Sequence, residues 1–206
     1  MTEHYYSAHP TSASHPQQIE AVLRGNRLRF WVDRGTFSTR RVDFGTRLLI
    51  ESLALPERGR FLDLGCGWGA IAVAVAKAFP RLQTYAVDVN GRAVALCRRN
   101  AQENGVEVTA AEGEGIAPFE AICFDSIATN PPVRAGKAVV FHLFAQAAAH
   151  LSPNGTLWVV MQKKQGAGSA RATLQRLFQQ VDEVAHKSGY HVYRCANPQT
   201  ISACVP

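Results

Sequence analysis

The feature that most constrains the fold is a regular alternation of strand-like and helix-like segments after Pro56. Short apolar runs typical of buried strands alternate with longer segments in which apolar residues recur at helical spacing. This alternation is typical of a parallel sheet covered by helices on both faces. It predicts strands at residues 60–64, 83–87, 107–110, 126–129 and 156–161, and helices at 69–79, 91–104, 137–151 and 169–178.

The last two predicted strands have a different connection. Residues 181–187 and 190–195 are separated only by Ser188-Gly189. Two parallel strands need a crossover of a dozen or more residues, so these two must be antiparallel. The predicted core is therefore an α/β sheet of seven strands, mostly parallel, that ends in an antiparallel hairpin.

The segment before Pro56 is predicted to extend the same domain. Residues 1–17 form a polar arm without hydrophobic periodicity, and β-type runs at 18–24 and 27–32 flank Gly25-Asn26, as in a hairpin. Apolar residues at helical spacing follow from Phe44 to Leu55. Since 206 residues suit one core, we expect residues 57–206 to form it and residues 1–56 to be its extension.

Composition indicates which binding partners and which cellular compartment to expect. The net charge of +6 favours a polyanionic partner such as nucleic acid, with a merely basic, solvated surface as the alternative. The chain has no apolar run of ~18 residues and no secretory signal in its polar first twenty residues, so we expect a cytoplasmic protein without membrane contact. Its cysteines never form a C-x-x-C pair and its first three histidines are irregularly spaced, so we expect no metal site.

A glycine-rich loop follows the first core strand, in the order Asp63, Gly65, Cys66, Gly67, Gly69. Glycines at such a turn let a ligand lie against bare backbone amides at a helix N-terminus. Because Gly65, Gly67 and Ala70 also fit the dinucleotide pattern, a nicotinamide or flavin oxidoreductase is an alternative. Asp63 favours a different ligand, since its carboxylate suits a cationic amino-acid group better than a pyrophosphate.

Two acidic residues end the next strands of the predicted sheet. Asp88 is placed to accept hydrogen bonds from both hydroxyls of a ribose, and its alternative role is to cap the following helix. Glu112, followed by Gly113, is placed to hold an adenine amine, with a solvated loop acid as the alternative.

Asn130, Pro131 and Pro132 follow the fourth strand, at the carboxyl edge where open α/β sheets bind ligands. Each proline fixes its own φ and restricts the residue before it. Asn130 Oδ1 and the Pro131 carbonyl would then form a rigid acceptor pair for the two N–H groups of a planar amine. The alternative is that Pro-Pro only ends the strand.

These motifs together resemble the class I S-adenosylmethionine-dependent methyltransferases, which have a Rossmann-like fold and modify exocyclic or amide nitrogens. More closely, Phe37-Ser38, residues 41–49 (RVDFGTRLL) and residues 130–137 (NPPVRAGK) resemble the methyltransferase small (MTS) domain of the ribosomal small-subunit RNA guanine-N2 methyltransferase C family. Larger members of that family carry two such domains in tandem. This chain has length for one, so it resembles the single-domain relatives.

The resemblance implies S-adenosylmethionine as cofactor, RNA as partner in rRNA processing, and a monomer or homodimer. It implies an N-methyltransferase acting on guanine N2 of ribosomal RNA; the alternatives are a protein glutamine amide, a small-molecule amine, or an RNA-binding assembly factor without activity. The implied catalytic residues are Asn130, Pro131 and Pro132. The implied cofactor contacts are Asp63, Gly65, Cys66, Gly67, Gly69, Asp88, Val89, Glu112, Gly113 and Asn130. The implied substrate contacts are Phe37, Arg41, Asp43, Phe44, Thr46, Val133, Arg134 and Lys137.

Two features bear on how RNA would be held. Val133 stands where many amine methyltransferases have an aromatic residue, so we expect a stacking substitute from Phe37, Phe44 or Trp31. Arginine is dense between Arg24 and Arg47, which fits backbone binding or a solvated basic hairpin. We place the positive excess of the chain there and at Arg134 and Lys137, which flank Asn130 and either hold phosphates or are solvated. The target base would have to be unpaired or flipped to reach Asn130.

Overall fold

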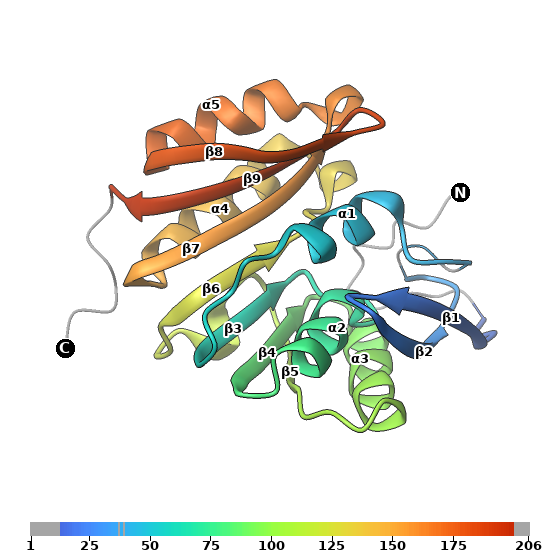
Figure 1. The fold of residues 1–206 in the computed structure, drawn as a ribbon. Helices are drawn as coiled ribbons and strands as arrows, with labels where there is room; N and C mark the ends of the chain where they lie inside the picture. The colour runs from blue at the N-terminus through green and yellow to red at the C-terminus, as the bar shows by residue number, and fades with distance from the viewer. Residues whose placement is uncertain (1–12, 37, 39, 200–206) are drawn as a thin grey trace.

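The computed structural model describes residues 13–36, 38 and 40–199, and its centre is a seven-stranded sheet in the order β5-β4-β3-β6-β7-β9-β8 (Figure 1). Its strands are β3 (Gly59–Leu64), β4 (Leu82–Asp88), β5 (Thr109–Glu112), β6 (Phe124–Thr129), β7 (Leu151–Gln162), β8 (Phe178–Lys187) and β9 (Tyr190–Pro198). Strands β3 to β7 pair in parallel, whereas β9 lies antiparallel to both β7 and β8. The predicted sheet and its terminal antiparallel hairpin are confirmed.

The helices are α1 (Phe44–Ser52), α2 (Ala70–Ala78), α3 (Gly91–Glu103), α4 (Lys137–Ala149) and α5 (Ala167–Leu177). Every predicted helix and strand in the described residues is present. The largest difference is that β7 begins at Leu151 rather than at residue 156, because Leu151 is buried and pairs with Phe124 of β6. The sequence pattern did not predict the short 3-10 turns η1 (Ala117–Phe119), η2 (Val133–Ala135) and η3 (Lys163–Gln165).

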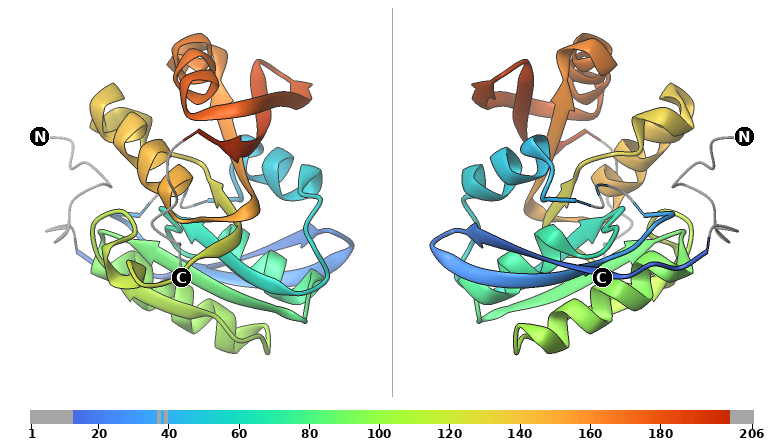
Figure 2. Two further views of the ribbon diagram at one scale, coloured as in Figure 1. Left: turned by 90° about the vertical axis from the view of Figure 1, so that its left-hand side faces the viewer. Right: turned by 90° about the vertical axis from the view of Figure 1, so that its right-hand side faces the viewer.

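Helices cover both faces of the sheet, as the two views in Figure 2 show. Successive residues of a strand point to opposite faces, so β7 sends Trp158 and Val160 into one hydrophobic cluster and Leu157 and Val159 into the other. The first cluster includes residues of α1, α2 and α3, and the second includes residues of α4 and α5. No helix among the described residues is both long and apolar enough to cross a membrane.

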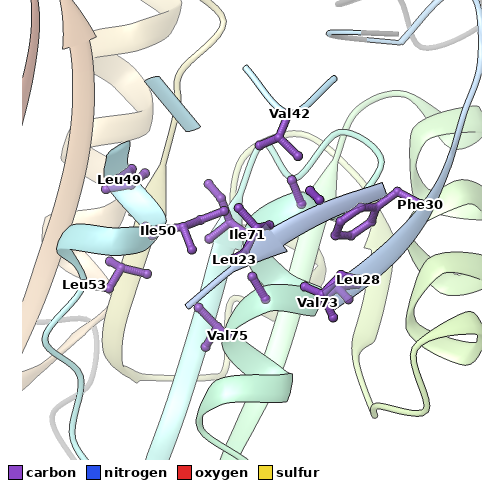
Figure 3. Close-up of a cluster of buried hydrophobic side chains, with 14 of the residues drawn as sticks. Leu23, Leu28, Phe30, Val42, Leu49, Ile50, Leu53, Ile71, Val73 and Val75 are labelled. Atoms are coloured by element: carbon purple, nitrogen blue, oxygen red, sulfur yellow. The ribbon is translucent and has the colours of Figure 1, made fainter. Parts of the chain in front are cut away.

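The N-terminal hairpin consists of β1 (Gln17–Leu23) and β2 (Asn26–Val32) and forms its own two-stranded sheet. Its turn residues Arg24 and Gly25 both have positive φ, 48° and 76°, as a tight two-residue hairpin turn requires. Figure 3 shows Leu23, Leu28 and Phe30 of the hairpin beside residues of α1 and α2 in one cluster. The hairpin therefore shares the hydrophobic core of the sheet domain.

Two asparagine side chains, one in α3 and one at its C-terminal end, form hydrogen bonds with the backbone of β2. Asn100 is fully buried, accepts from Trp31 N at 2.6 Å, and donates to the carbonyls of Trp31 at 2.9 Å and Trp68 at 2.8 Å. One turn later, Asn104 exchanges two hydrogen bonds with the backbone of Arg29 at 3.0 and 2.7 Å. The amides thus replace a neighbouring strand and fix the hairpin on α3.

Replacing Asn100 with alanine is expected to lower the free energy of unfolding by about 3 kcal/mol, because backbone groups of Trp31 and Trp68 lose their partner inside the protein. Chemical denaturation would measure this loss. The matched control is Asn104→Ala, whose contacts with Arg29 are open to water, and its expected cost is about 1 kcal/mol. Equal costs for the two variants would contradict this account of the hairpin.

Candidate active site

The glycine loop leads directly from the end of β3 into α2. Gly65, Gly67 and Gly69 have φ values of 77°, 53° and 89°, in the region that favours glycine. A Cβ built on Gly65 or Gly67 would meet no atom within 4 Å, so open space lies above the loop. A Cβ on Gly69 would lie 2.6 Å from Sγ of Cys97, so this third glycine allows α2 to pack against α3.

Asp88, at the end of β4, joins the loop to the start of α3. Its Oδ2 accepts from Gly67 N at 2.8 Å and its Oδ1 accepts from Asn90 N at 2.9 Å. Burial raises the pKa of the Asp88 carboxyl, and these backbone donors act in the opposite direction. Asn90 is the residue whose side chain caps α3, so the alternative capping role for Asp88 is wrong.

Asp63 lies fully buried below the loop. Its Oδ2 accepts from Ala72 N at 2.9 Å in the first turns of α2, and its Oδ1 has no hydrogen-bond partner among the described residues. Burial raises the pKa of Asp63 to about 7; the Ala72 amide opposes this shift and the charge of Asp88 adds to it. Asp63 is not among the residues that line the cavity above the loop.

One cavity of about 440 Å³ extends from the glycine loop to the carboxyl end of β6. Seven of the predicted cofactor residues line it, namely Gly65, Cys66, Gly67, Asp88, Val89, Gly113 and Asn130. The other catalytic residues and four predicted substrate residues also line it, namely Pro131, Pro132, Asp43, Thr46, Val133 and Arg134. A single cavity thus brings together motifs that lie far apart in the sequence.

Asn130 is held by the N-terminus of α1. Its Nδ2 donates to Thr46 Oγ1 at 2.9 Å and to Asp43 Oδ2 at 3.4 Å. The same Asp43 oxygen caps α1 by accepting from Gly45 N and Thr46 N. Because a carboxylate can only accept, the amide nitrogen must face Asp43. Oδ1 therefore remains as a hydrogen-bond acceptor without a partner among the described residues.

The Pro131 carbonyl, the second predicted acceptor, already accepts one hydrogen bond within the chain. The Pro131 carbonyl accepts from Val133 N at 2.8 Å, and the Pro132 carbonyl accepts from Ala135 N at 2.9 Å. The second of these bonds begins η2 immediately after the two prolines. A carbonyl oxygen has two lone pairs, so Pro131 keeps one for a ligand.

Tyr190, which the sequence analysis did not single out, is an aromatic residue on the cavity wall, and Trp68, which is buried, lines the cavity as well. Its ring centroid lies 5.5 Å from that of Phe44, and a Cβ on Gly45 would lie 2.7 Å from two of its ring carbons. Burial raises the pKa of Tyr190, and the charge of Asp43 raises it further, so the phenol is protonated at neutral pH. Phe44 supports Tyr190 from outside the cavity.

The other predicted aromatic residues do not provide a cavity wall. Trp31 packs against the core, with the guanidinium of Arg99 3.7 Å above its ring, and Phe37 lies outside the described residues. Four further predicted contacts also lie off the cavity, namely Gly69, Glu112, Arg41 and Lys137. The carboxylate of Glu112 lies against Gly91 at the start of α3.

The loop after β2 supplies the cavity residues Gly35 and Thr36, which no motif indicated, and Ser38, which belongs to the Phe37-Ser38 motif. Asn90 Nδ2 donates to the Gly35 carbonyl at 2.9 Å, so the cap of α3 also holds this loop. Asp33, next to it, accepts from Ser14 Oγ at 2.7 Å and from His15 N at 2.6 Å. Burial opposes its ionisation, but these hydrogen bonds, one from Arg34 N, and the nearby charge of Arg92 lower the pKa of Asp33.

Several arginines of the expected basic cluster make contacts within the protein. Arg24 donates to the carbonyls of Ile50 and Leu53 at 2.9 Å each, and Arg47 donates to the Val22 carbonyl at 2.6 Å. Arg29 forms an ion pair with Glu103 at 3.7 Å. These side chains hold the hairpin against α1 and α3, which weakens the expectation that the whole cluster faces RNA.

One group of possible metal ligands lies on the terminal hairpin, away from the cavity lining. Glu183, His186 and His191 place their ligand atoms within 4.8 Å of one another. The two imidazole rings are stacked 4.1 Å apart at 16°. A metal ion lies in the plane of each histidine ring that binds it, so nearly parallel rings cannot share one ion in this arrangement. The expectation of a protein without a metal site stays a prediction.

Comparison with known proteins decides the family. Residues 27–194, most of the chain, match the family model described as methyltransferase small domain. The chain belongs to the methyltransferase small domain family. This confirms the resemblance inferred from Phe37-Ser38, residues 41–49 and residues 130–137.

Two similar proteins differ in how much of their length this chain matches. The chain is 44% identical over 197 residues to the uncharacterized protein YbxB of Bacillus subtilis, which covers 94% of this chain and 98% of that protein. It is 34% identical over 163 residues to the ribosomal RNA small subunit methyltransferase C of Shewanella halifaxensis, which covers 77% of this chain and 46% of that protein. The chain thus spans about half the length of the curated rRNA methyltransferases that it matches.

A solved structure has the same fold. A 16S rRNA N2 methyltransferase of T. thermophilus, in complex with AdoMet and guanosine, superposes with a TM-score of 0.80 at 25% identity. The match covers 91% of this chain and 52% of that one.

This family member is a methyltransferase, and its cofactor is S-adenosylmethionine. The site fits that cofactor: open space lies above Gly65 and Gly67, and the Asp88 carboxylate stands on the wall beside them. The family assignment replaces the alternative of a dinucleotide-dependent oxidoreductase.

Proposed function

We propose that this protein transfers a methyl group to the N2 amine of guanine in small-subunit ribosomal RNA. The observation that carries the proposal is Asn130 Oδ1, which is fixed on the wall of the cofactor cavity and has no hydrogen-bond partner among the described residues. The names of the Shewanella and T. thermophilus relatives support the choice of RNA and of a guanine amine.

In this proposal Asn130 and Pro131 hold the amine. Guanine N2 carries two N–H groups in the plane of the base, and Oδ1 of Asn130 and the remaining lone pair of the Pro131 carbonyl accept one each. When bound, S-adenosylmethionine supplies a methyl group on positively charged sulfur. The residues act by orientation, which is worth up to ~7 to 11 kcal/mol in favourable cases. No strong general base is needed, because the methylated nitrogen is acidic and loses its proton to water.

Asp43 and Thr46 act as positioning residues in this scheme. Both bind the amide nitrogen of Asn130, and Asp43 is itself fixed by capping α1. The N-terminus of α1 therefore selects the orientation in which Oδ1 is available to substrate. This extends the predicted role of Asp43 and Thr46, which was direct substrate contact.

Tyr190 provides the face on which the target base stacks in place of an aromatic residue at position 133. Replacing Tyr190 with alanine is expected to lower kcat/KM for RNA by roughly tenfold or more, because base–aromatic stacking contributes about 1–3 kcal/mol. Steady-state methylation kinetics would measure the change. Tyr190→Phe keeps the ring and should retain most of the activity, whereas equal losses in the two variants would contradict a stacking role.

The proposed function is tested by incubating the protein with methyl-labelled S-adenosylmethionine and small-subunit RNA that lacks base methylation. Nuclease digestion and mass spectrometry should identify labelled N2-methylguanosine. The same reaction should include ribosomal proteins and free amines as competing acceptors, because the Asn-Pro-Pro geometry also suits a glutamine amide. Label on protein or on a small amine, with none in RNA, would overturn the proposal.

A further inference from the structure

One long segment of the chain contains basic residues but no acidic ones. Residues 126–181 contain no aspartate or glutamate and six basic residues, namely Arg134, Lys137, Lys163, Lys164, Arg171 and Arg176. The remaining 150 residues carry sixteen basic and sixteen acidic side chains, so they are neutral as a whole. The excess of this segment therefore equals the net charge of the chain, and it includes Arg134 and Lys137, whereas the arginines of residues 24–47 are offset by acidic residues elsewhere in the chain.

The fold brings four of these six cations to the carboxyl edge of the sheet, where the cavity also lies. Arg134 lies in η2, Lys137 begins α4, and Lys163 and Lys164 lie in η3, which follow β6 and β7 at the carboxyl edge of the sheet. Because β8 runs parallel to β7, the end of β8 lies at the same edge and adds Lys187 (Figure 1). We call Arg134, Lys137, Lys163, Lys164 and Lys187 the basic rim.

Contacts between the elements hold the basic rim together. Lys163 N donates to the Gly189 carbonyl at 2.7 Å, which ties η3 to the β8–β9 turn. A Cβ on Gly166 would lie 4.0 Å from Cε of Lys137, so the start of α4 adjoins the end of η3. Arg134 and Tyr190 both line the cavity that contains Asn130. The rim is therefore continuous with the proposed binding site for the target base.

The charges of the basic rim are not compensated within the described residues. All five side chains are exposed, and none of them forms an ion pair or a side-chain hydrogen bond there. Arg24, Arg29 and Arg47 differ, since they bind carbonyls or a carboxylate of the protein. Asp43, the carboxylate on the cavity wall near Tyr190, caps α1. Free cations beside a concave site are suited to an anionic chain rather than to a single small ligand.

We propose that the basic rim binds the phosphates of an unpaired RNA strand on either side of the nucleotide whose base enters the cavity. This inference rests on the proposed function, because it takes RNA as the substrate. Cations on three successive elements along one edge match phosphates repeated along a strand, whereas Asn130 and Tyr190 line the cavity itself. Phosphate contacts of this kind set affinity and register, and Tyr190 and Asn130 act on the base.

The test compares RNA binding by Lys163→Gln/Lys164→Gln with that of the wild type. The probe is a fluorescein-labelled, unpaired oligoribonucleotide with a single guanosine, titrated by fluorescence anisotropy over a series of salt concentrations. Two lost phosphate contacts should weaken binding roughly tenfold and reduce the slope of log K against log salt by about 1.4. The matched control is Arg58→Gln/Arg81→Gln, which removes the same charge at exposed positions beside the starts of β3 and β4, at the opposite edge of the sheet.

The proposal would be overturned if the rim variant kept the RNA affinity and salt slope of the wild type. It would also be overturned if the control variant lost as much affinity and slope as the rim variant. Calorimetry with S-adenosylmethionine should give the same affinity in all three proteins, because neither lysine lines the cavity. If the wild type binds RNA through the basic rim but transfers no methyl group to it, the proposed function is wrong and the proposal for the basic rim is supported. If RNA does not bind and a protein is methylated instead, the rim proposal fails as well.

Discussion

Replacing Asn130 with alanine is expected to lower the rate of methyl transfer by about a hundred- to a thousandfold, because the substrate amine loses its fixed acceptor. The affinity for S-adenosylmethionine should stay within a few-fold of the wild-type value, since the glycine loop and Asp88 remain. Single-turnover kinetics measures the first quantity and calorimetry the second.

Thr46→Val is the control for the Asn130 prediction. It keeps Asn130 but removes the hydroxyl that accepts from Nδ2 at 2.9 Å, so the amide is less firmly oriented. We expect a loss of roughly tenfold in rate, with RNA binding retained. An Asn130→Ala variant with nearly full activity, or one that loses cofactor affinity as much as rate, would contradict the assigned role.

Replacing Gly67 with leucine is expected to weaken S-adenosylmethionine binding by at least roughly a hundredfold. The new side chain would occupy the open space above the loop, where the cofactor is expected to lie. Leucine at a φ of 53° also strains the backbone, at an expected cost of about 1–2 kcal/mol in the free energy of unfolding. Calorimetry and chemical denaturation separate the two effects.

Gly105 offers a matched control for the Gly67 prediction. It has a φ of 61°, no atom within 4 Å of a built Cβ, and a position at the exposed end of α3, away from the cavity. Gly105→Leu should show the same loss of stability with unchanged cofactor affinity. Normal cofactor binding by Gly67→Leu would mean that the cofactor does not lie over this loop.

The parts of the site that local sequence could predict lie where a strand ends. The glycine loop follows β3, Asp88 ends β4 and Asn130 follows β6, and the carboxyl ends of parallel strands meet at one edge of a sheet. Strand and helix periodicity therefore sufficed to bring these residues together. The antiparallel β8–β9 pair was equally predictable, because only Ser188-Gly189 connects the strands.

The parts that local sequence could not predict depend on packing between distant segments. Tyr190 reaches the cavity because β9 lies between β7 and β8 and because Gly45 leaves room for its ring. Asp43 and Thr46 face Asn130 only through the docking of α1. The contacts of the arginines are a further example, since the sequence does not show that a guanidinium binds backbone carbonyls, as that of Arg24 does.

The most direct test of the account is to map N2-methylguanosine in small-subunit ribosomal RNA from cells with and without this protein. We predict that one guanine loses its N2 methyl group when the protein is absent. The wild-type chain should restore the modification, and Asn130→Ala, produced at the same level, should not. An unchanged N2-methylguanosine map in cells that lack the protein would contradict the account.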